Sequence, residues 1–245
     1  MTELNFSQFL LTGIDAKKFL QGQVTCNVAK LADTSDYQAT AICNLKGRVA
    51  FGIWLKQLAP EQYAIVISQD CAENFAKHIK KFGAFSKMTL VNPEPIFAIV
   101  ENGIPTFSQN AKENADDWQA VSIAQGNYWI THATQDLFQP QELRLHQRGG
   151  VDYDKGCYLG QEIIARLWFK ASPKAWLHRV SEIGDLPNAG EKLEKIDVVN
   201  SIAMQNDEKG SFEALVVARP ADLATVGLTV LGFPSALQQP VERAK

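Results

Sequence analysis

The sequence has no long hydrophobic run and no strong excess of charge of either sign. No apolar stretch approaches the roughly 18–20 residues that a membrane-spanning helix needs, and the first ten residues carry Glu3 and lack the basic region of a secretory signal. Lys and Arg number 24 against 27 Asp and Glu, which gives a net charge of −3. We therefore expect a cytoplasmic protein with no membrane partner and no strong direct binding to nucleic acid, since nucleic-acid-binding domains are usually basic.

Cysteine is also scarce. Cys26, Cys43, Cys71 and Cys157 are scattered, with no Cys-x-x-Cys pair and no histidine at zinc-ligand spacing. A disulfide framework has a denser pattern and needs an oxidising compartment. We therefore predict no metal site, and we expect some of these thiols to be small buried side chains.

With 245 residues, of which 46% are hydrophobic and 21% charged, the chain is long enough for one or two globular domains. Its first part predicts a helix capped by Asp15 and a second helix that starts at Asp70, with Glu73 completing a capping box. The β-rich segments are 37–43 and 49–55, joined by a turn at 44–47, and then 63–68, 88–91 and 96–100. This order predicts an α+β fold with helices on a largely antiparallel sheet.

The second half is more irregular. We expect a loop with a short helix over 103–118, a strand over 128–131 and a long loop over 138–156, the kind of segment that often carries function. After Pro173, short β-like pieces alternate with Gly, Pro and Asn, which indicates a small all-β unit. We predict one domain over 1–171 and a C-terminal domain over 172–245.

The segment 154–162, Asp-Lys-Gly-Cys-Tyr-Leu-Gly-Gln-Glu, carries the densest set of reactive groups. If a helix begins after Gly160, Cys157 lies just before its N-terminus and beside Lys155. Both features favour the thiolate. A tight structural turn with an inert cysteine explains the same residues equally well. The histidines, at 78, 132, 146 and 178, show no spacing that would pair one of them with this thiol.

Residues 155–162 resemble the K-G-C-[FY]-x-G-Q-E signature of the YgfZ proteins, folate-binding relatives of the glycine-cleavage T-protein, an aminomethyltransferase. Supporting motifs cover nearly the whole chain. They are Gly-Ile-Asp-Ala at 13–16, Phe-Leu-Gln-Gly-Gln-Val-Thr at 19–25, Asn-Leu-Lys-Gly-Arg at 44–48, Phe-Gln-Pro-Gln at 138–141 with Leu145 and Gly-Gly at 149–150, and Leu-Pro-Asn-Ala-Gly-Glu at 186–191.

The resemblance implies an aminomethyltransferase-like arrangement of ferredoxin-like, folate-binding α+β subdomains in a ring, with a C-terminal β-barrel. It implies tetrahydrofolate or a folate derivative as cofactor, and iron–sulfur client enzymes or assembly factors as partners. The implied function is a folate-dependent accessory role in the assembly or repair of iron–sulfur proteins. An effect on tRNA modification would then be indirect, through an iron–sulfur enzyme.

The resemblance also assigns residues. The family's two aromatic folate contacts fall on Phe6, where close bacterial relatives have Trp, and on Trp118. An aromatic ring can stack on a pterin, although each ring is also an ordinary core side chain. The reactive centre maps to Cys157 and Lys155, with Cys157 as nucleophile, redox thiol or transient cluster ligand. One cysteine alone cannot hold a cluster that needs four ligands.

Tyr158, Gln161, Glu162 and Arg166 complete the cluster that the resemblance assigns to cofactor binding. Glu162 and Arg166 are four residues apart on the expected helix and can pair. As an exposed ion pair they would contribute little to stability.

Two departures from the family pattern matter. The chain is short between Lys87 and Trp118, so part of the folate pocket's rim is expected to be missing. No convincing counterpart of the T-protein's catalytic aspartate stands out among Asp15, Asp116 and Asp117. The readings that remain are the accessory factor, a non-catalytic folate-binding or interaction protein, and, with the least support, a true aminomethyltransferase.

Overall fold

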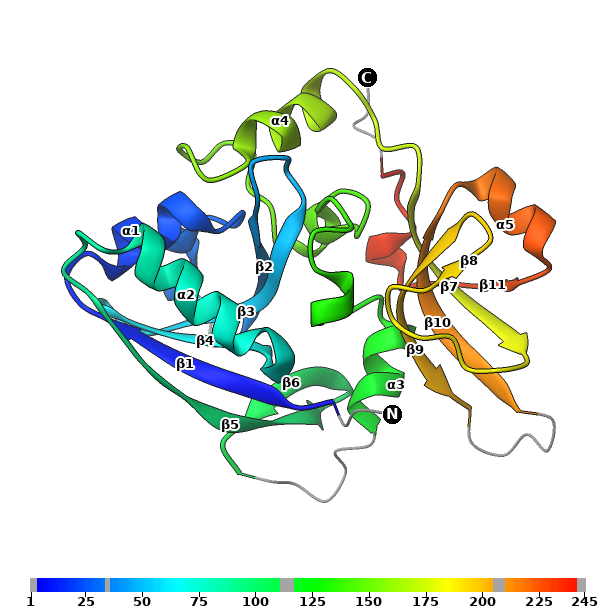
Figure 1. Cartoon of the computed structure of the whole chain (residues 1–245), viewed down its shortest axis with the longest axis horizontal. Coiled ribbons are helices and arrows are strands. Elements are labelled where there is room, and N and C mark those ends of the chain that lie inside the picture. The colour runs from blue at the N-terminus through cyan, green and yellow to red at the C-terminus, as the bar shows by residue number, and fades with distance from the viewer. Residues whose placement is uncertain (1–3, 34–35, 111–116, 205–209, 242–245) are drawn as a thin grey trace.

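Two antiparallel sheets face each other in the computed structural model, which describes residues 4–33, 36–110, 117–204 and 210–241 (Figure 1). The first sheet has six strands in the order β2-β3-β4-β1-β5-β6. The strands and helices of this part are β1 (Phe6–Thr12), α1 (Ala16–Gln23), β2 (Gln38–Cys43), β3 (Val49–Ala59), β4 (Gln62–Ser68), α2 (Ala72–Phe82), β5 (Thr89–Glu101), β6 (Ile104–Ser108) and α3 (Asp117–Ala124).

The six-stranded sheet is buried on both faces. In β4, Tyr63, Ile65 and Ile67 point into a core that α1 and α2 cover, whereas Val66 points into a second core on the opposite face. The strand therefore reads as a continuous apolar run, because successive side chains alternate between two buried faces. The second core is the one that the rest of the chain packs against.

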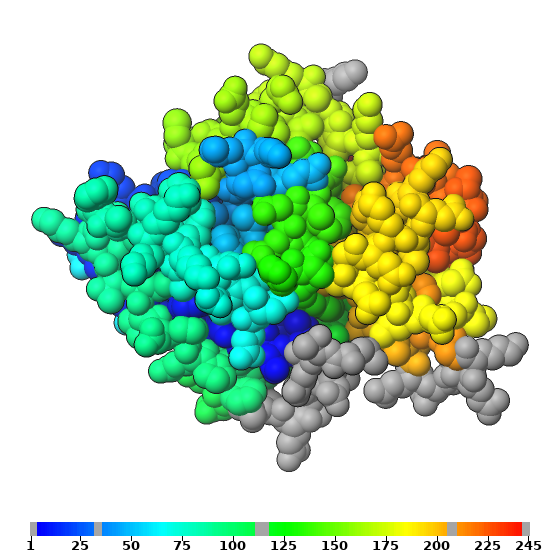
Figure 2. All heavy atoms as spheres, in the orientation of Figure 1, coloured from blue at the N-terminus to red at the C-terminus, as the bar shows by residue number. Residues whose placement is uncertain are grey.

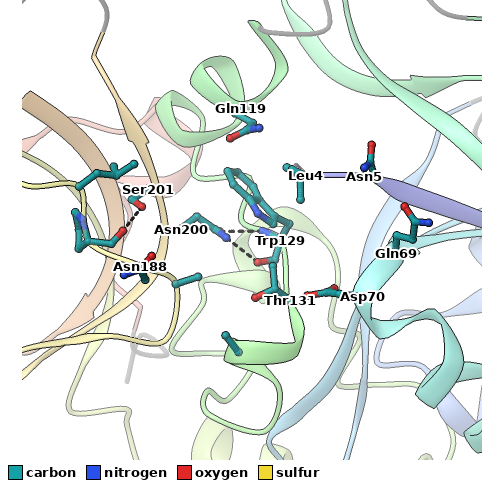
Figure 3. A pocket seen from close by; sticks show the side chains of 14 residues that line it. Leu4, Asn5, Gln69, Asp70, Gln119, Trp129, Thr131, Asn188, Asn200 and Ser201 are labelled. Carbon is teal, nitrogen blue, oxygen red and sulfur yellow. Dashed lines mark hydrogen bonds between the residues drawn. The ribbon is translucent and has the colours of Figure 1, made fainter. Parts of the chain in front are cut away.

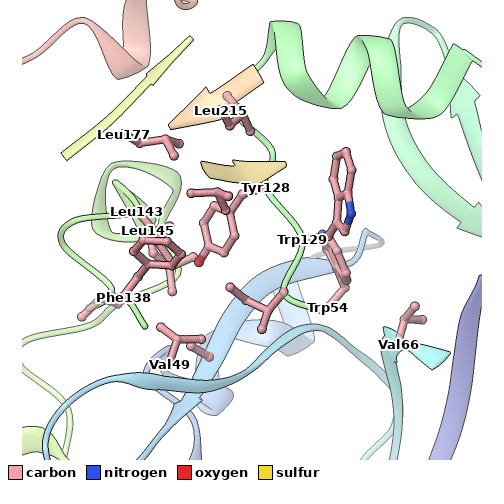
Figure 4. Close-up of a cluster of buried hydrophobic side chains, with 14 of the residues drawn as sticks. Val49, Trp54, Val66, Tyr128, Trp129, Phe138, Leu143, Leu145, Leu177 and Leu215 are labelled. Atoms are coloured by element: carbon pink, nitrogen blue, oxygen red, sulfur yellow. The ribbon is translucent and has the colours of Figure 1, made fainter. Parts of the chain in front are cut away.

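The second sheet is a curled, five-stranded half-barrel in the order β11-β7-β10-β9-β8. Its elements are α4 (Gln161–Phe169), which precedes it, then β7 (Trp176–Ile183), β8 (Lys192–Leu193), β9 (Ile196–Ala203), β10 (Ser211–Ala218), α5 (Pro220–Val226) and β11 (Thr229–Leu231). Leu177 of β7 and Leu215 of β10 lie over Tyr128 and Leu143 (Figure 4). The core between the sheets thus includes side chains from both of them. The division at 171/172 stays a prediction.

Most sequence predictions for these elements are confirmed: the hairpin β2–β3, strand β4, a helix after Asp15, and the short strands after 173. The α+β class is also confirmed. The sequence did not predict the helix α5 or the strands β1, β6 and β8. The pieces 88–91 and 96–100 form the single strand β5. Pro93 and Pro95 are tolerated there because β5 pairs with β1 up to Ile96 and with β6 only from Phe97 onwards, which leaves the prolines on a free edge.

Both predicted helix caps are wrong, because each carboxylate accepts a hydrogen bond from another part of the chain. Asp15 precedes α1, but its side chain accepts the N–H of Lys87 at 2.7 Å. Asp70 lies in a 3-10 turn before α2, and its carboxylate accepts the N–H of His132 at 2.8 Å. Each aspartate therefore ties a helix start to a distant loop.

Segment 128–131 is irregular and not the predicted strand. The side chain of Asn200 in β9 takes the place of a neighbouring strand. Its Oδ1 accepts the N–H of Trp129 at 3.0 Å, and its Nδ2 donates to the carbonyl of Trp129 at 2.9 Å. One buried amide therefore binds the backbone N–H and carbonyl of Trp129, which a neighbouring strand would otherwise bind.

Candidate functional site

A hollow of about 850 Å³ lies between the two sheets (Figure 3). Its walls come from the start of β1, the turn before α2, the segment 129–133, the loop 186–189 and β9. The lining residues are Leu4, Asn5, Gln69, Asp70, Gln119, Trp129, Thr131, Ala133, Leu186, Pro187, Asn188, Ala189, Asn200 and Ser201. A pocket of this size with a few convergent polar groups is typical of a small-molecule site.

Trp129 is the aromatic side chain in the pocket wall, and the two bonds from Asn200 fix its backbone. Behind it stands a cluster of aromatic rings. Trp118 is 5.5 Å from Trp129, and Phe6 is 5.1 Å from Trp118, measured between ring centroids. Trp54 and Phe107 complete the cluster. Trp129 therefore packs against a buried aromatic cluster.

The polar part of the lining consists mainly of amides and one carboxylate. Four amide side chains each offer a hydrogen-bond donor and an acceptor: Asn5, Gln69, Gln119 and Asn188. The carboxylate of Asp70 offers two acceptor oxygens. Because one Asp70 oxygen accepts the N–H of His132, the carboxylate is held in place at the wall. This set suits a flat heterocycle with its own N–H groups and carbonyl oxygens.

The segment 155–162 lies elsewhere, between α1 and the hairpin β2–β3. The N–H of Leu159 donates to the carbonyl of Gly22 at 3.1 Å. Gly160 has a positive φ of 79°, and a Cβ there would lie 2.5 Å from the carbonyl oxygen of Asn44. This close approach of backbones requires glycine, and α4 begins at the next residue as predicted.

Gly160→Ala is therefore expected to lower the free energy of unfolding by about 2–4 kcal/mol, from backbone strain plus the clash with Asn44. Gly156→Ala is the matched control, since no atom lies within 4 Å of its added Cβ and its φ is not positive. Urea unfolding followed by circular dichroism measures both. Equal losses in the two variants would contradict the assigned role of Gly160.

Lys155 is buried, and its ammonium group holds the turn after α1. Nζ donates to the carbonyl oxygens of Gln21, Val24 and Cys26 at 2.7, 2.6 and 2.8 Å, and lies 4.8 Å from the ring centroid of Tyr158. Burial lowers the pKa of Lys155 to about 8. The thiol that interacts with this charge is Cys26, whose own pKa is raised by burial.

Cys157 is exposed, unlike Cys26, Cys43 and Cys71. It comes three residues before Gly160, which occupies the N-cap position of α4. Within the described ranges, no group of three or more His, Cys, Asp or Glu side chains is arranged to hold a metal ion. The geometry therefore gives Cys157 access to a partner molecule and leaves its chemistry open.

The comparisons with known proteins bear on both places. No family model matches the sequence. The chain is 27% identical to the tRNA-modifying protein YgfZ of Escherichia coli, over 79% of this chain and 75% of that protein, and equally similar to the protein of the same name from Shigella dysenteriae. The resemblance to the YgfZ family is confirmed.

The fold is also confirmed by a solved structure. The glycine cleavage system aminomethyltransferase T from Bartonella henselae superimposes with a TM-score of 0.61, over 88% of this chain and 76% of that one, at 10% identity. This identity supports the fold alone. No helix in the described part of the YgfZ-like chain is long and apolar enough to cross a membrane.

The residues that the YgfZ resemblance singled out fall into two groups. Phe6 and Trp118 meet in the aromatic cluster behind the pocket, 3% and 1% exposed. The other six, Lys155, Cys157, Tyr158, Gln161, Glu162 and Arg166, are in the segment before α4 or on α4 itself. None of the eight lines the pocket, so their parts in catalysis or folate binding stay predictions.

Two details of the α4 group differ from expectation. Glu162 and Arg166 are both exposed and form no ion pair with each other. Tyr158 is 8% exposed, with its N–H donated to the side chain of Gln161 at 3.3 Å. These two residues therefore brace the start of α4.

Sequence reasoning missed the residues that line the pocket. The described residues between Lys87 and Trp118, the region that we expect to be short for the family, contribute none of them. The sequence analysis considered three aspartates as counterparts of the T-protein's catalytic aspartate. Of these, Asp15 immediately precedes α1, Asp117 begins α3, and Asp116 lies outside the described residues. The pocket carboxylate is Asp70 instead. One signal was available for Asn200: a polar residue directly after Val198 and Val199 in a buried strand must find partners.

Proposed function

We propose that this chain is a folate-dependent accessory protein that binds a reduced folate in the pocket between the two sheets. The observation that carries the proposal is Trp129, a clamped aromatic ring in the wall of a pocket of about 850 Å³, backed by Trp118 and Phe6. Trp118 and Phe6 are the two rings that the YgfZ resemblance links to folate. The fold shared with an aminomethyltransferase supports the same ligand class.

The lining residues fit the parts of a folate. A pterin has a planar face that can stack on Trp129. Its N–H groups can donate hydrogen bonds to the Asp70 carboxylate. Asn188, Gln119 and Gln69 can bond the remaining polar atoms. When bound, a reduced folate supplies a carrier for one-carbon units. The residues of this chain would orient it and exclude water from its pterin end.

Calorimetry with tetrahydrofolate tests the pocket. Asp70→Asn keeps the shape and still accepts the His132 N–H, and it should weaken binding by about tenfold through loss of a charged acceptor. Trp129→Ala should weaken binding by tenfold or more. Glu94→Gln is the control, an exposed carboxylate in β5 away from the pocket. Unfolding curves verify that each variant is folded, and unchanged affinity in both pocket variants would refute the site.

We assign the accessory role to the second place in the structure, the segment around Cys157. Its exposed thiol is available to iron–sulfur client enzymes or assembly factors. It would act as a nucleophile, a redox thiol or a transient cluster ligand. An effect on tRNA would be indirect, through an iron–sulfur enzyme. In cells that lack their own YgfZ, the wild-type chain should restore the activity of an iron–sulfur enzyme and Cys157→Ser should not. Full restoration by Cys157→Ser would favour a non-catalytic folate-binding protein.

One observation favours a second candidate, aminomethyl transfer. Asp70 is a carboxylate in the pocket wall, where the sequence suggested none. A carboxylate near a bound folate could assist one-carbon transfer by charge or proton transfer. Turnover of tetrahydrofolate with an aminomethyl donor, abolished in Asp70→Asn, would support this activity. Absence of turnover in the folate-bound wild type would reject it.

A further inference from the structure

One corner of the molecule, remote from the pocket, collects positive charge and exposed apolar side chains. We call it the lysine corner and define it by Ile14, Lys17, Lys18, Lys80, Lys81, Phe82, Phe85 and Lys87. All eight are exposed. The ring of Phe85 is fully exposed, and Ile14 and Phe82 are 68% and 45% exposed.

The corner is one surface because α1 and the loop after α2 are bonded together. The N–H of Asp15 donates to the carbonyl of Lys87, and the Asp15 carboxylate accepts the N–H of Lys87 at 2.7 Å. Gly83 packs against Phe19 of α1. In Figure 1 the end of α2 and the helix α1 lie together at the left edge, and Figure 2 shows the end of α2 and the loop after it at the surface.

A hollow of about 400 Å³ lies against the exposed face of α1. It is lined by Ile14, Lys17, Lys18, Gln21 and Ala29. It shares no residue with the pocket between the sheets. The corner therefore offers an apolar recess with two ammonium groups at its rim.

The lysines of the corner are not neutralised by ion pairs in the described part of the chain. None of its five lysines forms an ion pair with a described residue. The Asp15 carboxylate lies within this surface, where it accepts the N–H of Lys87. Five positive side chains gather here in a chain whose net charge is −3. Apolar patches of this kind on a soluble domain mark interaction sites.

We propose that the lysine corner docks an acidic, amphipathic segment of a partner protein. Phe85, Phe82 and Ile14 would bury against apolar side chains of the partner, and the lysines around them would face its carboxylates. A second copy of this chain fits badly, since two such corners would place like charges together. RNA is the less favoured partner, because the corner has no arginine. Since the exposed rings of Phe82 and Phe85 could also stack on bases, RNA is included in the test.

The test uses the full chain and three fluorescein-labelled 18-residue helical peptides in fluorescence anisotropy. The first peptide has Glu on one face and Leu and Phe on the other. The second replaces Glu by Lys, and the third replaces Leu and Phe by Ser. An 18-nucleotide single-stranded RNA and anionic vesicles are tested alongside. We expect binding of the first peptide only, weakening as salt rises.

The variants decide whether binding occurs at the corner. Lys80→Glu/Lys81→Glu/Lys87→Glu should weaken the first peptide by about tenfold or more, and Phe85→Ser by severalfold. Lys170→Glu/Lys174→Glu/Lys195→Glu is the matched change of charge on exposed lysines elsewhere. Tetrahydrofolate binding serves as a readout that none of these variants should alter, which separates this proposal from the pocket.

Three outcomes overturn the proposal: no binding of the first peptide, equal binding by the corner and control variants, or tighter corner-dependent binding of RNA or vesicles. Sedimentation of the wild type adds a fourth. A dimer that Phe85→Ser dissociates would make the corner a contact between copies of this chain.

Discussion

Acidification from pH 7 to pH 4 should remove several kcal/mol of stability from this protein. His146 and His178 lie where the first part of the chain meets the C-terminal half-barrel. Burial, reinforced by the charge of Arg144, lowers the pKa of each to about 4 from an ordinary value of 6.5. In the unfolded chain both histidines take up protons below about pH 6.5, whereas in the folded protein they stay neutral until about pH 4.

The direction follows from proton uptake. Because the unfolded state binds more protons in this window, the free energy of unfolding falls as the pH falls. Each histidine contributes up to about 1.4 kcal/mol per pH unit, so the pair contributes up to about 3 kcal/mol per unit. Both imidazole rings are largely removed from water and lie near the Arg144 charge, which is why the folded protein resists their protonation.

Urea unfolding at pH 7, 6, 5 and 4.5 measures this slope. The double variant His146→Gln/His178→Gln should have a flatter profile, and His132→Gln, at an exposed histidine, should keep the wild-type slope. A wild-type profile that is flat between pH 6.5 and 4.5 would contradict the prediction.

Lys155→Met should cost about 3–5 kcal/mol of stability, because it leaves the carbonyls of Gln21, Val24 and Cys26 without their buried charged donor. Cys157→Ser, two residues away at an exposed position, should change stability by less than about 0.5 kcal/mol. Only Gly156 separates the two residues in the signature, yet the structure gives them different surroundings. Chemical unfolding of both variants measures the contrast.

The two variants also separate structure from chemistry. A stable Lys155→Met protein that fails to restore the iron–sulfur enzyme would assign Lys155 a chemical role beside Cys157. A destabilised Lys155→Met, together with an inactive but stable Cys157→Ser, would leave the chemistry to the thiol. Lys155→Arg is a further control, since it keeps the charge but cannot match three carbonyls around one nitrogen.

The sequence predicted what depends on local pattern. Alternating and continuous apolar runs predicted β2, β3 and β4, and the glycine before Gln161 predicted the start of α4. It failed where a side chain bonds to a distant segment. Asp15 and Asp70 look like helix caps until the loops at Lys87 and His132 are in place, and Trp129 lies in a β-rich run whose partner is an amide 71 residues later.

Contacts between distant segments also explain why the sequence did not predict the residues that line the pocket. Phe6 and Trp118 were singled out by resemblance, and the structure brings them together as the support of the pocket wall. The residues on the pocket surface, including Asp70 and Gln119, come from segments with no common motif. Only the packing of the two sheets brings them together.

The two hydrogen bonds between the Asn200 side chain and the Trp129 backbone also bear on the order of folding. During synthesis the six-stranded sheet can form long before β9 leaves the ribosome, but the Trp129 backbone has no partner until Asn200 arrives. The pocket walls at Asn5 and Ser201 are separated by almost 200 residues of chain, and contacts of such separation form slowly. The nascent chain should therefore complete the pocket between the sheets last, and if the proposed folate binding holds, a folate present during refolding would act on that final step.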